Sequence, residues 1–213
     1  MSKAYVKICG VKDLEIANHA IKCGASFLGF VFFKNSRRNI TVEQCDKILN
    51  VIDGRVKTVA VTVDPSINDL NTYSKMKFTH LQLHGNEGLK NVRNISETFN
   101  FKIIKSFSIT SEDDLDYVDD YCPYIEHILL DSRQKNDMPG GTGETFDWKI
   151  IKNFYPKKSF FLSGGLNTNN ISQALNLKKT EYFDVSSGVE NSEGIKDEKL
   201  ISEFISKANK AVK

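Results

Sequence analysis

Eight short apolar segments alternate with amphipathic segments along the whole chain. The apolar segments predict β-strands at about 4–9, 27–32, 58–63, 79–83, 102–106, 127–130, 159–162 and 182–185. Strict strand–helix alternation argues for an all-parallel sheet with helices outside it. Eight repeats, spaced by roughly 25 residues, favour a closed barrel over an open sheet. We therefore expect an α/β fold, a single (β/α)8 TIM barrel over residues 1–213, with a doubly wound sheet as the alternative.

Helix boundary signals fit the same pattern. Asp13 is placed to cap a helix that Gly24 would end. Thr41 and Gln44 form a capping-box pattern for a helix through Ile52. Further helices are expected from Ser66, over 87–98, from Ser111 to about Tyr121, after Trp148, over 167–177 and over 196–212.

Composition restricts the partners and the compartment. The formal net charge is only +2, without a basic block, which argues against nucleic acid or a membrane surface as a partner. No apolar stretch approaches the roughly 18 residues of a membrane span. The four cysteines show no CxxC spacing, and the chain enters a strand almost at once, with no room for a signal peptide. We expect reduced thiols and a cytoplasmic protein.

Two titratable residues close two of the expected strands. Cys9 ends the first apolar run, and Asp131 ends the run 128–131, ahead of a glycine-rich stretch at 140–143. Catalytic residues of barrel enzymes lie at the carboxyl ends of strands, so the pair suggests proton transfer. Each residue also has a purely structural alternative role. Cys9 could be a small buried apolar residue, and Asp131 could cap the following loop.

Glycines follow the last two strands. Gly164 and Gly165 come after strand seven, and Ser187 and Gly188 come after strand eight. Glycine lets backbone N–H groups approach an anion closely, and these two loops form the usual phosphate site of barrels. Either loop alone reads as a tight turn, whereas the two together indicate a phosphorylated small-molecule ligand.

Seven short motifs occur in order over nearly the whole chain. They are Lys7-Ile8-Cys9-Gly10, Leu81-Gln82-Leu83-His84-Gly85, Leu130-Asp131-Ser132, Gly141-Thr142-Gly143, Phe146-Asp147-Trp148, Leu162-Ser163-Gly164-Gly165-Leu166-Asn167 and Asp184-Val185-Ser186-Ser187-Gly188-Val189-Glu190. The ordered set resembles the phosphoribosylanthranilate isomerases of tryptophan biosynthesis. The resemblance implies a cofactor-free isomerase that converts N-(5-phosphoribosyl)anthranilate to 1-(2-carboxyphenylamino)-1-deoxyribulose 5-phosphate by an Amadori rearrangement.

The same resemblance implies roles for individual residues. It makes Cys9 the general base and Asp131 the general acid, and it places the substrate phosphate on the two glycine loops. It assigns the substrate carboxylate to Arg38, although the neighbouring Arg37 replaces a proline common in the family. Lys12 replaces a usual threonine, which could change the electrostatics near Cys9.

Three further residues are candidates for the substrate site. Lys7 lies two residues before Cys9, so the two share one face of the strand and the ammonium would favour a thiolate. His84 at a strand end could position substrate, and Gln82 is expected inside the barrel. His80 and His84 would be roughly 13 Å apart on a strand, too far to share an ion, so we expect no metal.

Other activities remain open at this stage. A histidine-pathway or dual-substrate aminoaldose isomerase is the nearest rival, although that chemistry would favour a carboxylate where this chain has Cys9. Indole-glycerol-phosphate synthase is disfavoured because no strand-one Lys-x-x-Ser-Pro is present. A non-catalytic barrel that binds a phosphorylated ligand is the non-enzyme alternative. The sequence leaves monomer or homodimer undecided, as it does closure of the loop 132–145 over the substrate.

Overall fold

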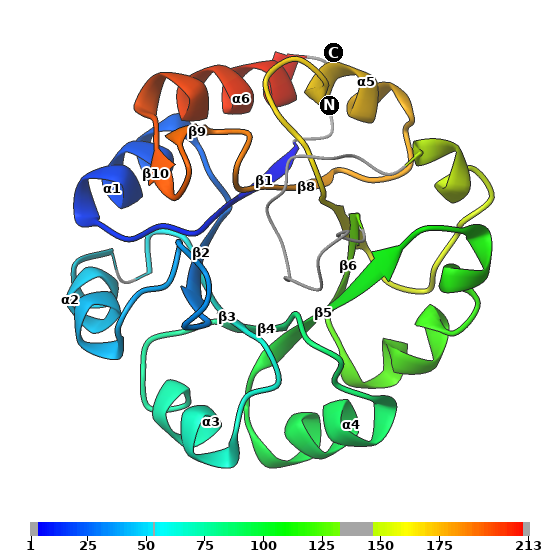
Figure 1. The fold of residues 1–213 in the computed structure, drawn as a ribbon, viewed down its shortest axis with the longest axis horizontal. Coiled ribbons are helices and arrows are strands. Elements are labelled where there is room, and N and C mark those ends of the chain that lie inside the picture. Colours follow the sequence, from blue (N-terminus) through cyan, green and yellow to red (C-terminus); the bar gives the residue numbers. More distant parts are fainter. Residues whose placement is uncertain (1–3, 53, 133–146, 211–213) are drawn as a thin grey trace.

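Eight parallel strands close into one barrel, each paired with its neighbour in chain order and β8 paired with β1 (Figure 1). The computed structural model describes residues 4–52, 54–132 and 147–210. The strands are β1 Tyr5–Cys9, β2 Phe27–Phe32, β3 Lys57–Thr62, β4 His80–Leu83, β5 Lys102–Ile109, β6 His127–Ser132, β7 Phe160–Leu162 and β8 Tyr182–Val185. The expected barrel is confirmed, and every expected strand is present.

Helices form a ring around the strands (Figure 1). The α-helices are α1 Leu14–Cys23, α2 Val42–Ile52, α3 Ile67–Tyr73, α4 Leu89–Thr98, α5 Ile171–Asn176 and α6 Glu198–Lys210. The 3₁₀ helices are η1 Glu112–Leu115, η2 Val118–Tyr124 and η3 Trp148–Ile151. None of the helices in the described ranges is long and apolar enough to cross a membrane.

The predicted helix caps are present. The Asp13 side chain accepts a hydrogen bond from the Ile16 amide at 2.8 Å, and Gly24 ends α1 in the left-handed conformation. Thr41 and Gln44 form reciprocal side chain–backbone hydrogen bonds, both at 3.2 Å, ahead of α2. These local signals fix where the outer helices begin and end.

Two expected helices are not α-helical. The segment from Ser111 to Tyr121 forms η1 and η2, and the segment after Trp148 forms η3. Ser111 and Asp114 form a capping box, in which Asp114 accepts from the Thr110 and Ser111 amides, so the expected start signal is present although the helix that follows is 3₁₀. Pro123 inside η2 also lacks an amide proton for a helical ladder. The prediction of α-helices behind β5 and β6 was therefore wrong.

A small hairpin precedes the last helix. Strands β9, Glu190–Ser192, and β10, Ile195–Lys196, pair antiparallel, so Lys196 belongs to a strand and not to the expected helix. The Asp197 side chain accepts from the Leu200 amide at 3.0 Å, which starts α6 at Glu198. The hairpin places Lys196 over the carboxyl end of the barrel, beside the candidate site.

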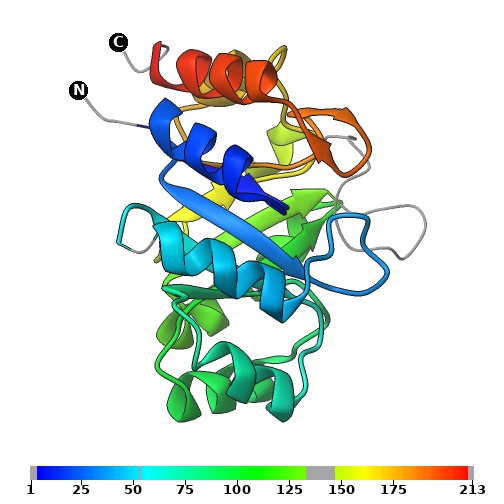
Figure 2. The ribbon, with the colours of Figure 1, turned by 90° about the vertical axis from the view of Figure 1, so that its left-hand side faces the viewer.

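Apolar side chains form two layers. The larger cluster fills the space between strands and helices, while a smaller cluster fills the barrel interior and includes Cys9, Phe27, Val59, Leu129 and Phe161. Because side chains alternate along a strand, each strand contributes to both layers. The carboxyl strand ends carry Cys9 and Asp131, and the amino ends lie at the opposite mouth of the barrel. Figure 2 shows the barrel from the side.

Candidate active site

A pocket at the carboxyl end of the barrel contains both proposed proton-transfer residues. Cys9 at the end of β1 and Asp131 in β6 line it together. The other expected site residues on its wall are Arg38, Gln82, His84, Gly164, Gly165 and Ser187. Strands that are distant in sequence therefore bring these side chains into one cavity, as barrel topology requires.

The Cys9 thiol lies against a lysine inside the barrel. A Cβ atom built on Gly29 of β2 would stand 3.1 Å from Cys9 Sγ and 3.2 Å from Lys7 Nζ, so the glycine leaves room for both groups. Burial raises the pKa of the Cys9 thiol, while the charges of Lys7 and Lys196 and a hydrogen bond from Lys7 oppose that rise. The site is built to limit the cost of forming a thiolate.

Lys7 is held by a carboxylate on the neighbouring strand. Its Nζ donates to Asp184 Oδ1 at 2.8 Å, and Lys7 and Asp184 face each other in the β1–β8 register. Ser163 Oγ donates to the other Asp184 oxygen at 3.3 Å. Lys7 is completely buried. It lies beneath the pocket wall, in contact with Cys9 and paired with Asp184.

Asp131 is oriented by its own strand end and by β4. Its Oδ1 accepts from the Ser132 amide at 2.8 Å, and its Oδ2 lies 3.3 Å from His84 Nε2. The other ring nitrogen of His84 is 2.8 Å from Gln82 Nε2. The chain Gln82–His84–Asp131 therefore fixes the carboxyl group at the pocket wall.

Arg38, and not Arg37, reaches the pocket. Arg38 donates through Nε and Nη2 to both oxygens of Glu190, each at 2.8 Å. Lys196 donates to the same carboxylate. Arg37 instead pairs with Glu193 at the surface and is 68% exposed. The guanidinium of Arg38 is thus held in one orientation before any ligand arrives.

Glu190 is the centre of this ion cluster. Burial raises the pKa of its carboxyl group, but the hydrogen bond from Arg38 and the charge of Lys196 outweigh burial and lower that pKa to about 2. Burial lowers the pKa of Lys196, which Glu190 partly restores. Lys196 and the pairing function of Glu190 are the parts of the site that sequence reasoning missed, because Lys196 was placed in a helix.

The two glycine loops lie side by side. Gly164 and Gly165 both have positive φ, of 78° and 65°. Gly188 pairs with Asn167 in a parallel bridge, and a Cβ on Gly188 would fall 1.9 Å from the Leu166 carbonyl oxygen. Gly188 therefore packs the loops together from outside the pocket wall, while the other glycines and Ser187 line it.

Lys12 is not on the pocket wall formed by the described residues. Its Nζ donates to the Arg37 carbonyl oxygen at 3.2 Å. The cations that interact with the Cys9 thiol include Lys7, Lys196 and Arg38. The glycine-rich stretch 140–143 and most of the loop 132–145 lie outside the described residues.

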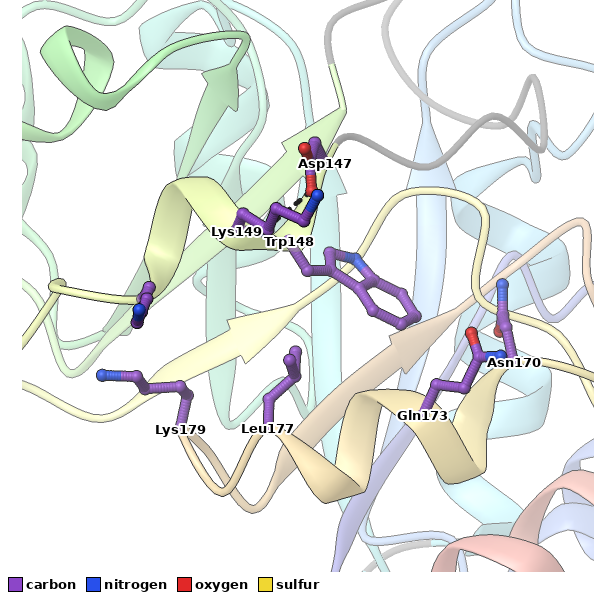
Figure 3. A pocket seen from close by; sticks show the side chains of 8 residues that line it. Asp147, Trp148, Lys149, Asn170, Gln173, Leu177 and Lys179 are labelled. Carbon is purple, nitrogen blue, oxygen red and sulfur yellow. Dashed lines mark hydrogen bonds between the residues drawn. The ribbon is translucent and has the colours of Figure 1, made fainter.

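A larger hollow, of about 450 Å³, lies outside the barrel between η3 and α5 (Figure 3). The Trp148 ring points across it towards Gln173 and Asn170 (Figure 3). Its one carboxylate, Asp147, already accepts a hydrogen bond from the Lys149 amide at 3.0 Å. The lining contains no thiol, hydroxyl or imidazole. The barrel pocket, although smaller, is therefore the better candidate for proton-transfer chemistry.

The family model and the similar known proteins point to the same family. The profile of the family described as N-(5'phosphoribosyl)anthranilate (PRA) isomerase matches residues 6–207. The N-(5'-phosphoribosyl)anthranilate isomerase of Sinorhizobium fredii is 39% identical over 212 residues, covering 98% of this chain and 95% of the relative. That of Zymomonas mobilis subsp. mobilis is 39% identical over 200 residues, covering 93% of this chain and 95% of the relative.

Solved structures agree with the sequence relatives. Phosphoribosyl anthranilate isomerase from Thermotoga maritima superposes with a TM-score of 0.86 at 34% identity, over 96% of this chain and 98% of that one. A phosphoribosyl anthranilate isomerase in complex with reduced 1-(o-carboxyphenylamino)-1-deoxyribulose 5-phosphate gives a TM-score of 0.82 at 32% identity, with the same coverage of both chains.

Proposed function

Because this chain belongs to the N-(5'-phosphoribosyl)anthranilate isomerase family, we propose that it catalyses the isomerisation of N-(5'-phosphoribosyl)anthranilate in tryptophan biosynthesis. The product is 1-(2-carboxyphenylamino)-1-deoxyribulose 5-phosphate. The observation that carries this proposal is that Cys9 of β1 and Asp131 of β6 line one pocket. An Amadori rearrangement needs such a base and acid on one substrate.

Asp131 supplies the acid of the first step. A proton passes from its carboxyl group to the furanose ring oxygen, the bond from that oxygen to C1 of the sugar breaks, and an iminium ion forms with the anthranilate nitrogen. The hydrogen bond from Ser132 and the contact with His84 hold the carboxyl group in place for this transfer. His84 and Gln82 act here as positioning residues, with His84 also on the pocket wall.

Cys9 supplies the base of the second step. Its thiolate removes the proton from C2 of the sugar, and the electron pair moves to the iminium to give an enolamine. A proton then returns to C1 and the C2 hydroxyl loses its proton, which gives the ketone. These two transfers restore the Cys9 thiolate and the Asp131 carboxyl group, so the reaction is a net isomerisation without a cofactor. Lys7 supports this step from beneath, because its ammonium stabilises the thiolate and is itself held by Asp184.

Two fixed sites hold the ends of the substrate. The guanidinium of Arg38 is directed into the pocket by Glu190 and meets the anthranilate carboxylate. The backbone N–H groups near Gly164, Gly165 and Ser187 receive the phosphate. Gly188 keeps the two phosphate loops adjacent. Binding both ends leaves the ribose between Cys9 and Asp131.

Turnover of freshly generated phosphoribosylanthranilate, followed by loss of its fluorescence, tests this function. The purified protein should consume that substrate and leave the histidine-pathway aminoaldose unchanged. Turnover of the aminoaldose alone would point to the rival isomerase, and turnover of both to a dual-substrate enzyme. Thermal stabilisation by a phosphorylated product analogue without turnover of either substrate would point to a barrel that only binds its ligand.

We expect the protein to be a monomer or a homodimer. One similar structure concerns monomers generated from the dimeric isomerase of Thermotoga maritima, with a TM-score of 0.82 at 32% identity. All the residues proposed to act here come from one chain. Light scattering at two protein concentrations distinguishes the two states.

A further inference from the structure

Two histidines and a carboxylate meet at the amino-terminal mouth of the barrel, opposite the pocket. His80 is the first residue of β4, His127 is the first residue of β6, and Glu126 directly precedes β6. One ligand atom from each residue lies within 4.8 Å of the ligand atoms of the other two. We propose that these three residues bind a divalent transition-metal ion of the zinc type.

The ring orientation supports this assignment. His80 Nδ1 is 2.8 Å from Thr79 Oγ1, whose single proton is donated to the Thr58 carbonyl at 2.8 Å. With the hydroxyl proton on that carbonyl, Thr79 accepts from His80, the ring proton lies on Nδ1 and the lone pair lies on Nε2. His127 Nδ1 is similarly occupied by Ser159 Oγ at 2.6 Å. Metal-binding histidines are commonly oriented in this way.

The Nε2 atoms of His80 and His127 are buried polar atoms without a partner among the described residues. His80 is 1% exposed and His127 is 5% exposed, and within the described part of the chain neither Nε2 has a hydrogen-bond partner. Ring contacts with Phe27, with Phe161 and Tyr182, and between the two imidazoles account for the packing of both histidines. They do not satisfy a buried polar nitrogen, which is costly to leave unpaired. An ion shared by both rings would satisfy the two atoms together.

Glu126 completes the set and gives solvent access. Its side chain is 35% exposed and accepts from Lys102 Nζ at 3.0 Å, so an ion can enter from the surface. Both rings are buried, and burial favours the neutral imidazole, the form that binds metal. Lys57 and Lys102 are nearby cations that oppose ion binding and reduce the affinity.

The ligand types indicate which ion would bind. Two imidazole nitrogens and one carboxylate oxygen match three-ligand zinc sites, with a water in the fourth position. Tetrahedral bonds of about 2.0–2.2 Å require ligand atoms roughly 3.4 Å apart, so the partly exposed Glu126 side chain would move inward. This mouth of a barrel serves stability and not chemistry. The ion should therefore raise thermal stability.

Metal titration of the chelator-treated protein tests the site directly. Co²⁺, followed by its visible absorption, and Zn²⁺, followed by calorimetry, should each bind at one ion per chain and raise the melting temperature. His80→Phe and Glu126→Gln should each weaken binding by at least about tenfold, as loss of metal-site partners does. Glu126 is partly exposed, so Glu126→Gln is expected to fold even if a buried variant does not.

His19→Ala is the matched control, because His19 also contacts metal-ligating residue types, Cys23 and Glu198, but lies outside the proposed site. It should bind the ions as the wild type does. Lys102→Met removes the competitor for Glu126 and should tighten binding. The assignment is overturned if the folded wild type binds neither ion at millimolar concentration. It is also overturned if binding is lost in His19→Ala or Cys9→Ala and kept in both site variants.

Discussion

His84 Nε2 lies 3.3 Å from Oδ2 of Asp131, which joins β4 to β6 across the pocket. Gln82 fixes the other ring nitrogen at 2.8 Å. The proposed acid is thus held by a residue whose own orientation is set by the strand beneath it. Such a chain can set the direction of a proton transfer without taking part in the bond changes.

Removing the His84 imidazole should leave the Asp131 carboxyl group less well oriented but still able to donate a proton. For His84→Ala we expect kcat to fall by roughly tenfold to hundredfold, the scale of a misplaced catalytic group. The unfolding midpoint should change little, because His84 lies on the pocket wall. Steady-state kinetics against His19→Ala as the control checks this, and an unchanged kcat would exclude the positioning role.

The Cys9–Lys7 contact predicts a pH dependence. Burial raises the pKa of the thiol above its ordinary value of 9.0, so the thiolate fraction, and with it kcat/KM, should increase from pH 7 to pH 9. Lys7→Met removes the cation that opposes this rise. We expect kcat/KM at pH 7.5 to fall by at least about tenfold, since one pKa unit is a factor of ten, and the rising limb to move to higher pH.

A double variant separates this effect from stability. Lys7→Met alone leaves Asp184 buried and unpaired, which costs about 3–5 kcal/mol of folding free energy. Lys7→Met with Asp184→Asn removes both charges and should recover much of that stability while remaining slow. Asp184→Asn alone is the reference, because the charge of Asp184 itself raises the pKa of the thiol. A double variant with the same pH profile as Asp184→Asn would show that Lys7 does not act on Cys9.

The Glu190 cluster predicts acid sensitivity. The pKa of this carboxyl group is about 2 in the folded chain against 4.5 ordinarily, so its contribution is complete above pH 4.5 and is lost as pH falls through 2. The loss should reach roughly 3 kcal/mol. Urea unfolding at pH 7, 4.5, 3 and 2 measures it, and Glu190→Gln should remove this part of the pH dependence.

At pH 7 the same substitution should destabilise the chain by about 3–5 kcal/mol, because Arg38 and Lys196 lose a buried partner. Glu97→Gln breaks the exposed Arg93–Glu97 pair and should cost far less, because solvent screens that pair. Equal costs for the two variants would mean that the Glu190 cluster adds nothing beyond a surface pair.

Position 164 requires glycine because of its positive φ and because of the atoms packed around it. Its φ is +78°, and a Cβ would come within 2.6 Å of the Ser132 amide nitrogen and 2.8 Å of Asp131 Oδ1. Gly164→Ala should destabilise the chain by about 1–3 kcal/mol and reduce kcat by displacing the acid. Gly88→Ala, where a Cβ would meet open space, is the control. Thermal unfolding and turnover together test this.

Periodicity and caps were sufficient to predict the barrel. The eight apolar runs became the eight strands, and Asp13 and the Thr41–Gln44 pair cap their helices as expected. The failures occur where local chemistry competes with the helix, as at Pro123 in η2. The hairpin containing Lys196 was also missed, because its partner Glu190 is held by Arg38, which is distant in sequence.

The active site was more predictable than the histidine cluster. Strand ends marked Cys9 and Asp131, because barrel topology gathers such positions. His80 was weighed only against His84 on the same strand, and that distance argument still holds. Its proposed partner, His127, comes from β6, and no spacing along the chain reveals which inward side chains meet across a barrel.

Turnover of phosphoribosylanthranilate by wild type, Cys9→Ala and Asp131→Ala tests the central claim most directly. Cys23→Ala, which removes a thiol on α1 away from the pocket, is the control. The account predicts that both site variants stay folded and lose about 10²–10⁴ in kcat, the scale of general acid–base catalysis, while Cys23→Ala remains fully active. Full turnover by folded Cys9→Ala or folded Asp131→Ala would contradict the proposed base or acid.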